Sequence, residues 1–148
     1  MRHSYECRLR WSDMDAFGHI NNVVFLRYLE EARVDLMFRG AREADPEAFA
    51  SGVVVARHEI DYLRPLVFRS EPVTVETWVS QLGAASATLT YEIREPGEVE
   101  DGPGRTGGPY VRAETVIVPY DLERGAPRRM SATEKSFLKG FQDDSHRG

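Results

Sequence analysis

A chain of 148 residues with 41% hydrophobic residues is long enough for one domain with a substantial core. Its formal net charge of −5 argues against a nucleic-acid-binding protein, which usually presents a basic face. Cys7 is the only cysteine, so an intrachain disulfide and a cysteine zinc cluster are excluded and a reducing cytoplasm is predicted. The sequence has neither the apolar core of a signal peptide nor about 18 consecutive apolar residues, so we expect no membrane insertion.

The first predicted element is a β-strand near the N-terminus, followed by one long helix. Residues 5–11 alternate apolar and polar side chains, which is typical of a strand buried on one face. After a polar loop the spacing changes to that of a helix whose apolar face is formed by Phe25, Leu29, Ala32 and Leu36. We expect this helix to run over 22–39, capped by Asn21 or Asn22 and stopped by Gly40.

Four further alternating segments predict four more strands, over residues 54–62, 73–79, 85–93 and 111–117. The short connection at Leu82 and Gly83 predicts a hairpin between the second and third of these strands. Residues 96–109 are rich in Gly and Pro and predict a mobile surface loop. Ser131 and Glu134 have the spacing of a capping box, which predicts a short helix over about 131–141.

This order of elements limits the fold class. One strand, one helix and four strands in a row cannot form a doubly wound parallel sheet, which needs helices between its strands. We therefore predict an α+β fold in a single domain over residues 1–148, with an antiparallel sheet wrapped around one helix. Such a sheet has exposed edges, so we expect subunits to associate and cover them.

Residues 12–33 contain the densest group of polar and charged side chains, in a loop that leads directly into the long helix. Asp15 is the candidate catalytic residue, because a carboxylate there lies beside unpaired N–H groups and the positive end of the helix dipole. Hydrolysis of an activated acyl group requires such a base and anion receptor. An isolated aspartate would also suit a turn, which is the role we expect for Asp13. Gly18 allows close approach of a ligand or positive φ, and His19 either serves the substrate or proton transfer or is a structural hydrogen-bonding group.

The sequence lacks the patterns typical of metal sites, serine nucleophiles and Walker-type nucleotide-binding loops. A calcium loop starting at Asp13 would need ligands at Phe17 and Val24, which cannot supply them. Zinc bound by Asp15 and His19 would need two more ligands, and the HExxH pattern is missing. No G-x-S-x-G or Walker motif is found in the sequence. We therefore expect neither a catalytic metal nor a cofactor.

Three segments carry a family resemblance. SDMDAFGHINN at 12–22, YLEEAR at 28–33 and HEIDYLRPL at 58–66, followed by strands with a Leu82-Gly83 turn, occur in this order. The chain resembles the hotdog-fold acyl-CoA thioesterases, specifically 4-hydroxybenzoyl-CoA thioesterase and the bacterial YbgC-like group, from about Tyr5 to Asp121. It departs from these members in GHINN, where they carry more apolar residues, and this difference leaves the acyl group open.

The resemblance implies a five-stranded antiparallel sheet curled around the long helix, in dimers that often assemble into tetramers. It also implies a cytoplasmic acyl-CoA thioesterase in which Asp15 is the nucleophile or the general base. The backbone N–H of Asn22 would polarise the thioester carbonyl. Gly18 and Asn21 would contact the substrate, and Tyr62 of a second subunit would line the substrate channel.

The phosphates of coenzyme A need local cations on an acidic protein. The candidates are Arg64, Arg69, Arg128, Arg129 and Lys135. Arg128 and Arg129 are the better pair, because they follow the last strand near an end of the sheet. Two alternatives stay open at this point: an acyl-CoA-binding hotdog module without catalysis, and a hotdog enoyl hydratase or dehydratase. Neither nucleic acid nor a membrane is an expected partner.

Overall fold

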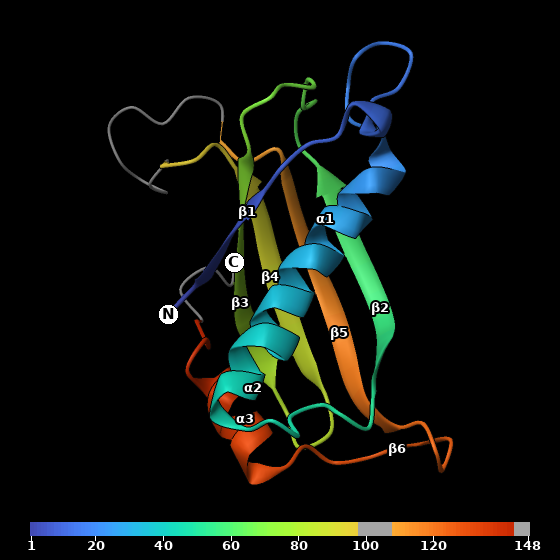
Figure 1. The fold of residues 1–148 in the computed structure, drawn as a ribbon, viewed down its shortest axis with the longest axis vertical. Helices are drawn as coiled ribbons and strands as arrows, with labels where there is room; N and C mark the ends of the chain where they lie inside the picture. The colour runs from blue at the N-terminus through green and yellow to red at the C-terminus, as the bar shows by residue number, and fades with distance from the viewer. Residues whose placement is uncertain (98–107, 144–148) are drawn as a thin grey trace.

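An antiparallel sheet crossed by one long helix forms the centre of the protein (Figure 1). The computed structural model describes residues 1–97 and 108–143. The strands lie in the order β1-β3-β4-β5-β2, and a short β6 pairs with β5. Their bounds are β1 His3–Cys7, β2 Val53–Tyr62, β3 Val73–Leu82, β4 Ala87–Arg94, β5 Val111–Asp121 and β6 Ala126–Pro127. The predicted fold, an antiparallel sheet curled around a long helix, is confirmed.

Helix α1 spans Asn22–Val34 and packs its apolar stripe against the sheet. Phe25, Leu29 and Ala32 are all buried, as the helical spacing predicts. The expected stop at Gly40 is wrong, because the chain continues as a π-helical segment over 35–40 and as α2, Ala41–Ala44. Gly40 has a helical φ of −67°. A Cβ there would lie 3.1 Å from the ring of Phe137, so this glycine allows the C-terminal helix to approach closely.

The first strand is shorter than expected. It ends at Cys7, and the chain then turns through a 3₁₀ helix, Trp11–Asp13. Trp11 is 72% exposed rather than buried in the core. The reason lies in Asp13, whose carboxylate accepts a hydrogen bond from the Arg10 N–H at 3.0 Å and closes the turn. A local side-chain contact thus overrides the alternation of residues 5–11.

Strand β2 forms one edge of the sheet and pairs with β5. The sequence pattern predicts a strand with one buried face, yet most β2 side chains are exposed and Val55 and Tyr62 are 40% and 44% exposed. An unpaired edge with exposed apolar side chains is a surface on which another strand can pair. The predicted association of subunits stays a prediction.

The remaining connections set the two ends of the sheet. Strands β3 and β4 form the predicted hairpin, in which the Gly83 N–H donates to the Ser86 carbonyl at 2.8 Å. The loop expected over 96–109 lies mostly in residues 98–107, outside the described residues. Helix α3, Ala132–Lys139, begins with the Ser131–Glu134 capping box. None of the helices in the described ranges is long and apolar enough to cross a bilayer.

Candidate functional site

Asp15 lies in a tight loop that its own carboxylate organises. Its Oδ1 accepts hydrogen bonds from the N–H groups of Phe17, at 2.8 Å, and His19, at 3.2 Å. The Asp15 N–H in turn donates to the His19 carbonyl at 2.7 Å. Gly18 has φ +77°, a conformation that residues with a Cβ adopt only under strain. Asp15 Oδ2 accepts no hydrogen bond from residues 1–97 or 108–143, so one carboxylate oxygen faces outward.

The connection between β2 and β3 holds this loop in place. The Gly18 carbonyl accepts a hydrogen bond from the Phe68 N–H at 3.0 Å, and the Ile20 N–H donates to the Leu66 carbonyl at 2.8 Å. His19 lies between these two contacts and forms a β-bridge with Val67. His19 therefore has a structural role through its backbone, and its imidazole makes no hydrogen bond within the described part of the chain.

The start of α1 follows directly after this loop. Asn21 is the N-cap, because its side-chain oxygen accepts a hydrogen bond from the Val23 N–H at 3.1 Å. Asn22 is the first helical residue, so its N–H has no intrahelical acceptor and points out of the positive end of the helix. The Tyr62 hydroxyl donates to the Asn22 carbonyl at 2.9 Å, and its ring packs against Phe25 with centroids 5.8 Å apart. Tyr62 of the same chain therefore lies at the first turn of α1.

Asp13 has the structural role that the sequence predicts. It is 1% exposed and accepts a hydrogen bond from the Tyr28 hydroxyl at 2.7 Å. Burial opposes ionisation, but the hydrogen bonds from Tyr28 and Arg10 outweigh it and hold the pKa of Asp13 below its usual value. The Asp13 carbonyl also accepts the Asn21 N–H at 3.0 Å. The role of Tyr28 was not predicted from the sequence, although a tyrosine on a buried helix face needs a partner for its hydroxyl.

The arginines expected to bind coenzyme A lie at different ends of the sheet. Arg64 follows β2 at the Asp15 end, where it donates to the Gly108 carbonyl at 2.8 Å and stacks on the Tyr110 ring. Arg128 and Arg129 lie at the opposite end, next to Pro119 and β6 (Figure 1). The sequence predicts that these two lie near an end of the sheet, and within one chain it is the end away from Asp15. Their role as phosphate contacts stays a prediction.

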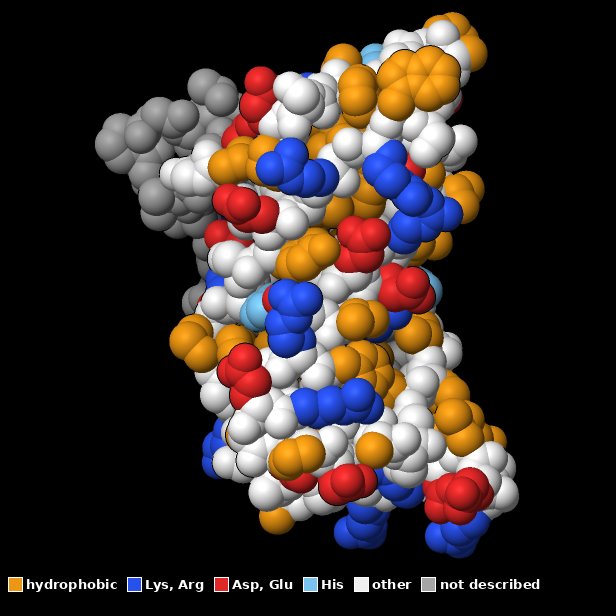
Figure 2. All heavy atoms as spheres, viewed as in Figure 1, with side chains coloured by type: hydrophobic (Ala, Val, Ile, Leu, Met, Phe, Trp, Pro, Cys, Tyr) orange, Lys and Arg blue, Asp and Glu red, His pale blue; other side chains and the backbone are white. Residues whose placement is uncertain are grey.

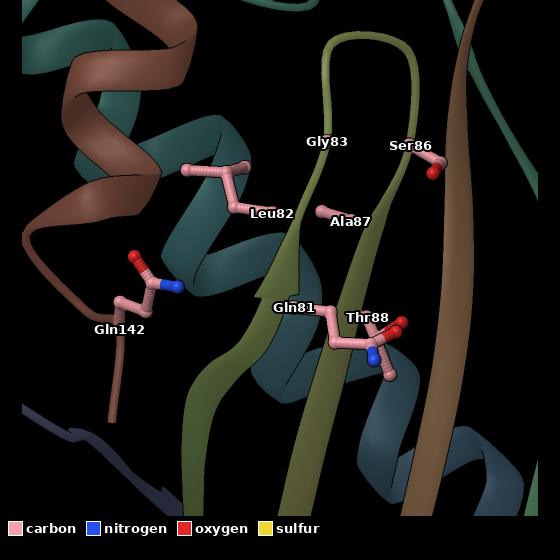
Figure 3. Close-up of a pocket in the computed structure, with 7 residues that line it drawn as sticks. All are labelled: Gln81, Leu82, Gly83, Ser86, Ala87, Thr88 and Gln142. Carbon is pink, nitrogen blue, oxygen red and sulfur yellow. The ribbon is translucent and has the colours of Figure 1, made fainter. Parts of the chain in front are cut away.

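The surface around Asp15 is apolar and open. Phe17 is 83% exposed and Val23 is 73% exposed. Hydrophobic side chains gather at the top of the molecule, over the loop that precedes α1 (Figure 2). A pocket of about 430 Å³ lies at the other end, at the β3–β4 turn, and contains none of the residues expected in the site (Figure 3). No group of three potential metal ligands occurs among the described residues.

Comparisons with known proteins agree with the fold. The family model described as thioesterase-like superfamily matches residues 9–140. The long-chain acyl-CoA thioesterase FadM of Escherichia coli is 31% identical over 88 residues, which are 60% of this chain and 66% of FadM. A Thermus thermophilus thioesterase, solved with coenzyme A and Zn, is 27% identical at a TM-score of 0.70, covering 94% of this chain and 92% of that one. The PA2801 protein of Pseudomonas aeruginosa is 28% identical at a TM-score of 0.72, covering 90% and 95%.

Proposed function

The chain belongs to the thioesterase-like superfamily and is a thioester hydrolase, and we propose that it hydrolyses acyl-coenzyme A with Asp15 as the catalytic carboxylate. The observation that carries this proposal is the difference between the two carboxylate oxygens of Asp15. Oδ1 is fixed by two backbone N–H groups, while Oδ2 is not engaged by the described residues. A carboxylate held in this way has a defined direction and a reactive oxygen.

Asp15 supports two chemical routes. In the first, Oδ2 attacks the carbonyl carbon, the C–S bond breaks, the thiolate takes a proton from solvent, and water then hydrolyses the anhydride. In the second, Oδ2 takes a proton from a water molecule as the water oxygen attacks the same carbon, and the thiolate leaves. Both routes place negative charge on the carbonyl oxygen in the transition state.

The start of α1 is suited to that charge. The Asn22 N–H has no intrahelical partner, and the helix dipole adds a partial positive charge at the same point. Loss of one such donor costs about 10²–10³ in kcat in other acyl-transfer enzymes. We therefore assign the thioester carbonyl oxygen to the Asn22 N–H, and assign Asn21 to holding that N–H in position rather than to the substrate.

Coenzyme A as the carrier is supported by two relatives, since FadM is an acyl-CoA thioesterase and the Thermus thioesterase was solved with coenzyme A. Arg64 is the candidate for a phosphate contact within the same chain, because it lies at the Asp15 end of the sheet. Arg128 is already neutralised, since it forms two parallel hydrogen bonds with Glu134 at 2.8 and 2.9 Å.

We further propose that two copies associate through β2 and close the acyl site. Among the described residues no strand pairs with the outer edge of β2, and Val23 and Tyr62 expose apolar surface beside it. An antiparallel pairing of two β2 strands would place the Arg128 end of one copy beside the Asp15 end of the other. In that arrangement Arg128 and Arg129 would flank the site of the second copy, and pairs of dimers would be a further step.

The test of catalysis is thiol release from a panel of short, long and aromatic acyl-CoAs. Asp15→Asn keeps an oxygen that can accept the two backbone hydrogen bonds, so we expect it to keep the fold and lose about 10²-fold or more in kcat. Asp15→Ala removes both functions and should lose activity and some stability. Folding of each variant is checked by circular dichroism and denaturant unfolding.

Asp121 supplies a matched control. Its Oδ1 accepts hydrogen bonds from the N–H groups of Glu123 and Arg124, both at 3.1 Å, in a turn similar to that of Asp15 but at the other end of the sheet. Asp121→Asn should therefore leave turnover unchanged. Full activity in Asp15→Asn would overturn the role of Asp15. Binding without turnover in the wild type would favour the acyl-CoA-binding module instead.

A further inference from the structure

A buried arginine lies between α1 and the sheet, away from the Asp15 loop. Arg33 is 9% exposed and its Nη1 donates to the hydroxyl of Tyr91, on β4, at 3.2 Å. Its charge partner is Glu30, one turn earlier on α1, but the closest approach of their charged atoms is 4.0 Å. The Glu30 side chain is 63% exposed. Most of its charge is therefore solvated and compensates the buried guanidinium only weakly.

Arg33 has unused hydrogen-bonding capacity. A guanidinium carries five N–H donors, and Tyr91 is the one acceptor within hydrogen-bond distance in the described part of the chain. Burial of a cation is costly unless acceptors satisfy it. A planar fork of donors of this kind matches a carboxylate, which can accept two parallel hydrogen bonds. The remaining donors of Arg33 can therefore serve an anionic acceptor.

His58 extends this polar cluster to the open edge of the sheet. Its Nδ1 lies 2.9 Å from the hydroxyl of Thr115, which is fully buried on β5. The pKa of His58 is lowered, mainly by burial and secondly by the positive charge of the nearby Arg33, so the imidazole is neutral at pH 7. In the tautomer in which Thr115 donates to Nδ1, the Nε2–H of His58 is a second donor. His58 itself is exposed, so a ligand can reach the cluster from the β2 side.

The cluster and the Asn22 N–H lie along the same side of α1. Tyr62 and His58 share one face of β2 and are about 13 Å apart along the strand, at about 3.3 Å per residue. Asn22 and Arg33 are about 16 Å apart along α1, at about 1.5 Å per residue. Side chains on a helix lean toward its N-terminus, so the Arg33 guanidinium lies closer to Asn22 than the spacing along the helix axis indicates. Ile60, half-buried, lies between Tyr62 and His58.

We propose that Arg33, with His58 and Tyr91, binds a carboxylate at the far end of the acyl group, so that the preferred substrates are medium-chain dicarboxylic acyl-CoAs. This proposal rests on the proposed function, because it places the thioester carbonyl at the Asn22 N–H. The acyl chain then runs along the boundary of α1 and β2, past Ile60, and its free carboxylate replaces Glu30 as the partner of Arg33.

The experiment compares octanedioyl-CoA with octanoyl-CoA, which differ in the terminal carboxylate. We measure kcat/KM for both in the wild type, Arg33→Met and Arg33→Lys. Arg33→Met should lower the ratio of octanedioyl to octanoyl kcat/KM by about 10- to 100-fold, mainly through KM. Arg33→Lys keeps the charge without the fork and should lower it less. Arg39→Met, which removes an 80% exposed arginine from the π-helical segment after α1, should leave the ratio unchanged.

Binding separates this proposal from the catalytic one. Titration calorimetry with Asp15→Asn as background measures the affinity for both thioesters whether or not the wild type turns them over. Tighter binding of octanedioyl-CoA, lost on adding Arg33→Met, would support the role of Arg33. Equal affinity for the two thioesters, or a loss of both to the same extent in Arg33→Met, would show that Arg33 is structural. Absence of thiol release in the wild type would instead overturn the proposed hydrolysis.

Discussion

Replacement of Glu134 by Gln should destabilise the protein in a way that depends on pH. Glu134 is 3% exposed, and its carboxylate joins three parts of the chain. It accepts two hydrogen bonds from Arg128, one from the Phe49 N–H, and one from the Ser131 N–H at 2.8 Å. Glutamine keeps the size and one oxygen acceptor but loses the charge and the second acceptor.

The pKa of Glu134 gives the magnitude. Burial alone would raise it, but the hydrogen bonds from Arg128, Ser131 and Phe49 lower it from 4.5 to about 2. Because the pKa is depressed in the folded state, the stabilisation is complete when the pH lies above the pKa of the unfolded state. It is lost as the pH falls toward the pKa of the folded state. The shift corresponds to about 3 kcal/mol at neutral pH, of which about 2 kcal/mol disappears between pH 6 and pH 3.

Denaturant unfolding of the wild type and Glu134→Gln at several pH values measures this effect directly. We expect a difference in unfolding free energy of about 3 kcal/mol at pH 7 that shrinks on acidification. Glu123→Gln is the control, because this substitution makes the same chemical change at an exposed residue. A difference that stays constant from pH 6 to pH 3, or a Glu134→Gln protein as stable as the wild type, would refute the reasoning.

Three further substitutions or modifications test the loop and the core. Gly18→Ala should cost about 1–2 kcal/mol of stability, measured by denaturant unfolding, because the positive φ of Gly18 is strained in alanine although no atom blocks the new Cβ. Tyr28→Phe should cost about 1–3 kcal/mol in the same assay, since it removes the hydrogen bond that the Tyr28 hydroxyl donates to the buried Asp13 carboxylate. Cys7 should resist iodoacetamide at pH 8 until the protein unfolds, because burial and Glu31 raise its pKa to about 12. Rapid alkylation of the native protein would contradict that burial.

Features encoded within a few neighbouring residues were predictable from the sequence. The Asn21 cap, the start of α1 and the β3–β4 hairpin each depend on contacts within about four residues, and each is found where the pattern indicates it. The fold class follows from the same local signals, because one strand, one long helix and four strands leave few arrangements.

The errors came from contacts between distant residues. Gly40 has the sequence signature of a helix end, but Phe137 packs against it from almost a hundred positions away. The end of the sheet at which Arg128 and Arg129 lie depends in the same way on the strand order, and within one chain it is opposite Asp15. The buried partnership of Arg33 with Tyr91 joins a helix to a strand and has no local signature at all.

The two sequence interpretations of Asp15, a turn former and a catalytic carboxylate, do not exclude each other. The turn uses Oδ1, which accepts the N–H groups of Phe17 and His19, and it orients the carboxylate relative to the start of α1. The proposed catalysis uses the other oxygen, together with an N–H that no carbonyl of the helix accepts, and the Asn22 N–H is of this kind. If one residue formed the turn and another supplied the carboxylate, a further contact would be needed to align the two residues. In the proposed mechanism one side chain performs both tasks, so the alignment of base and oxyanion donor is set within the eight residues from Asp15 to Asn22.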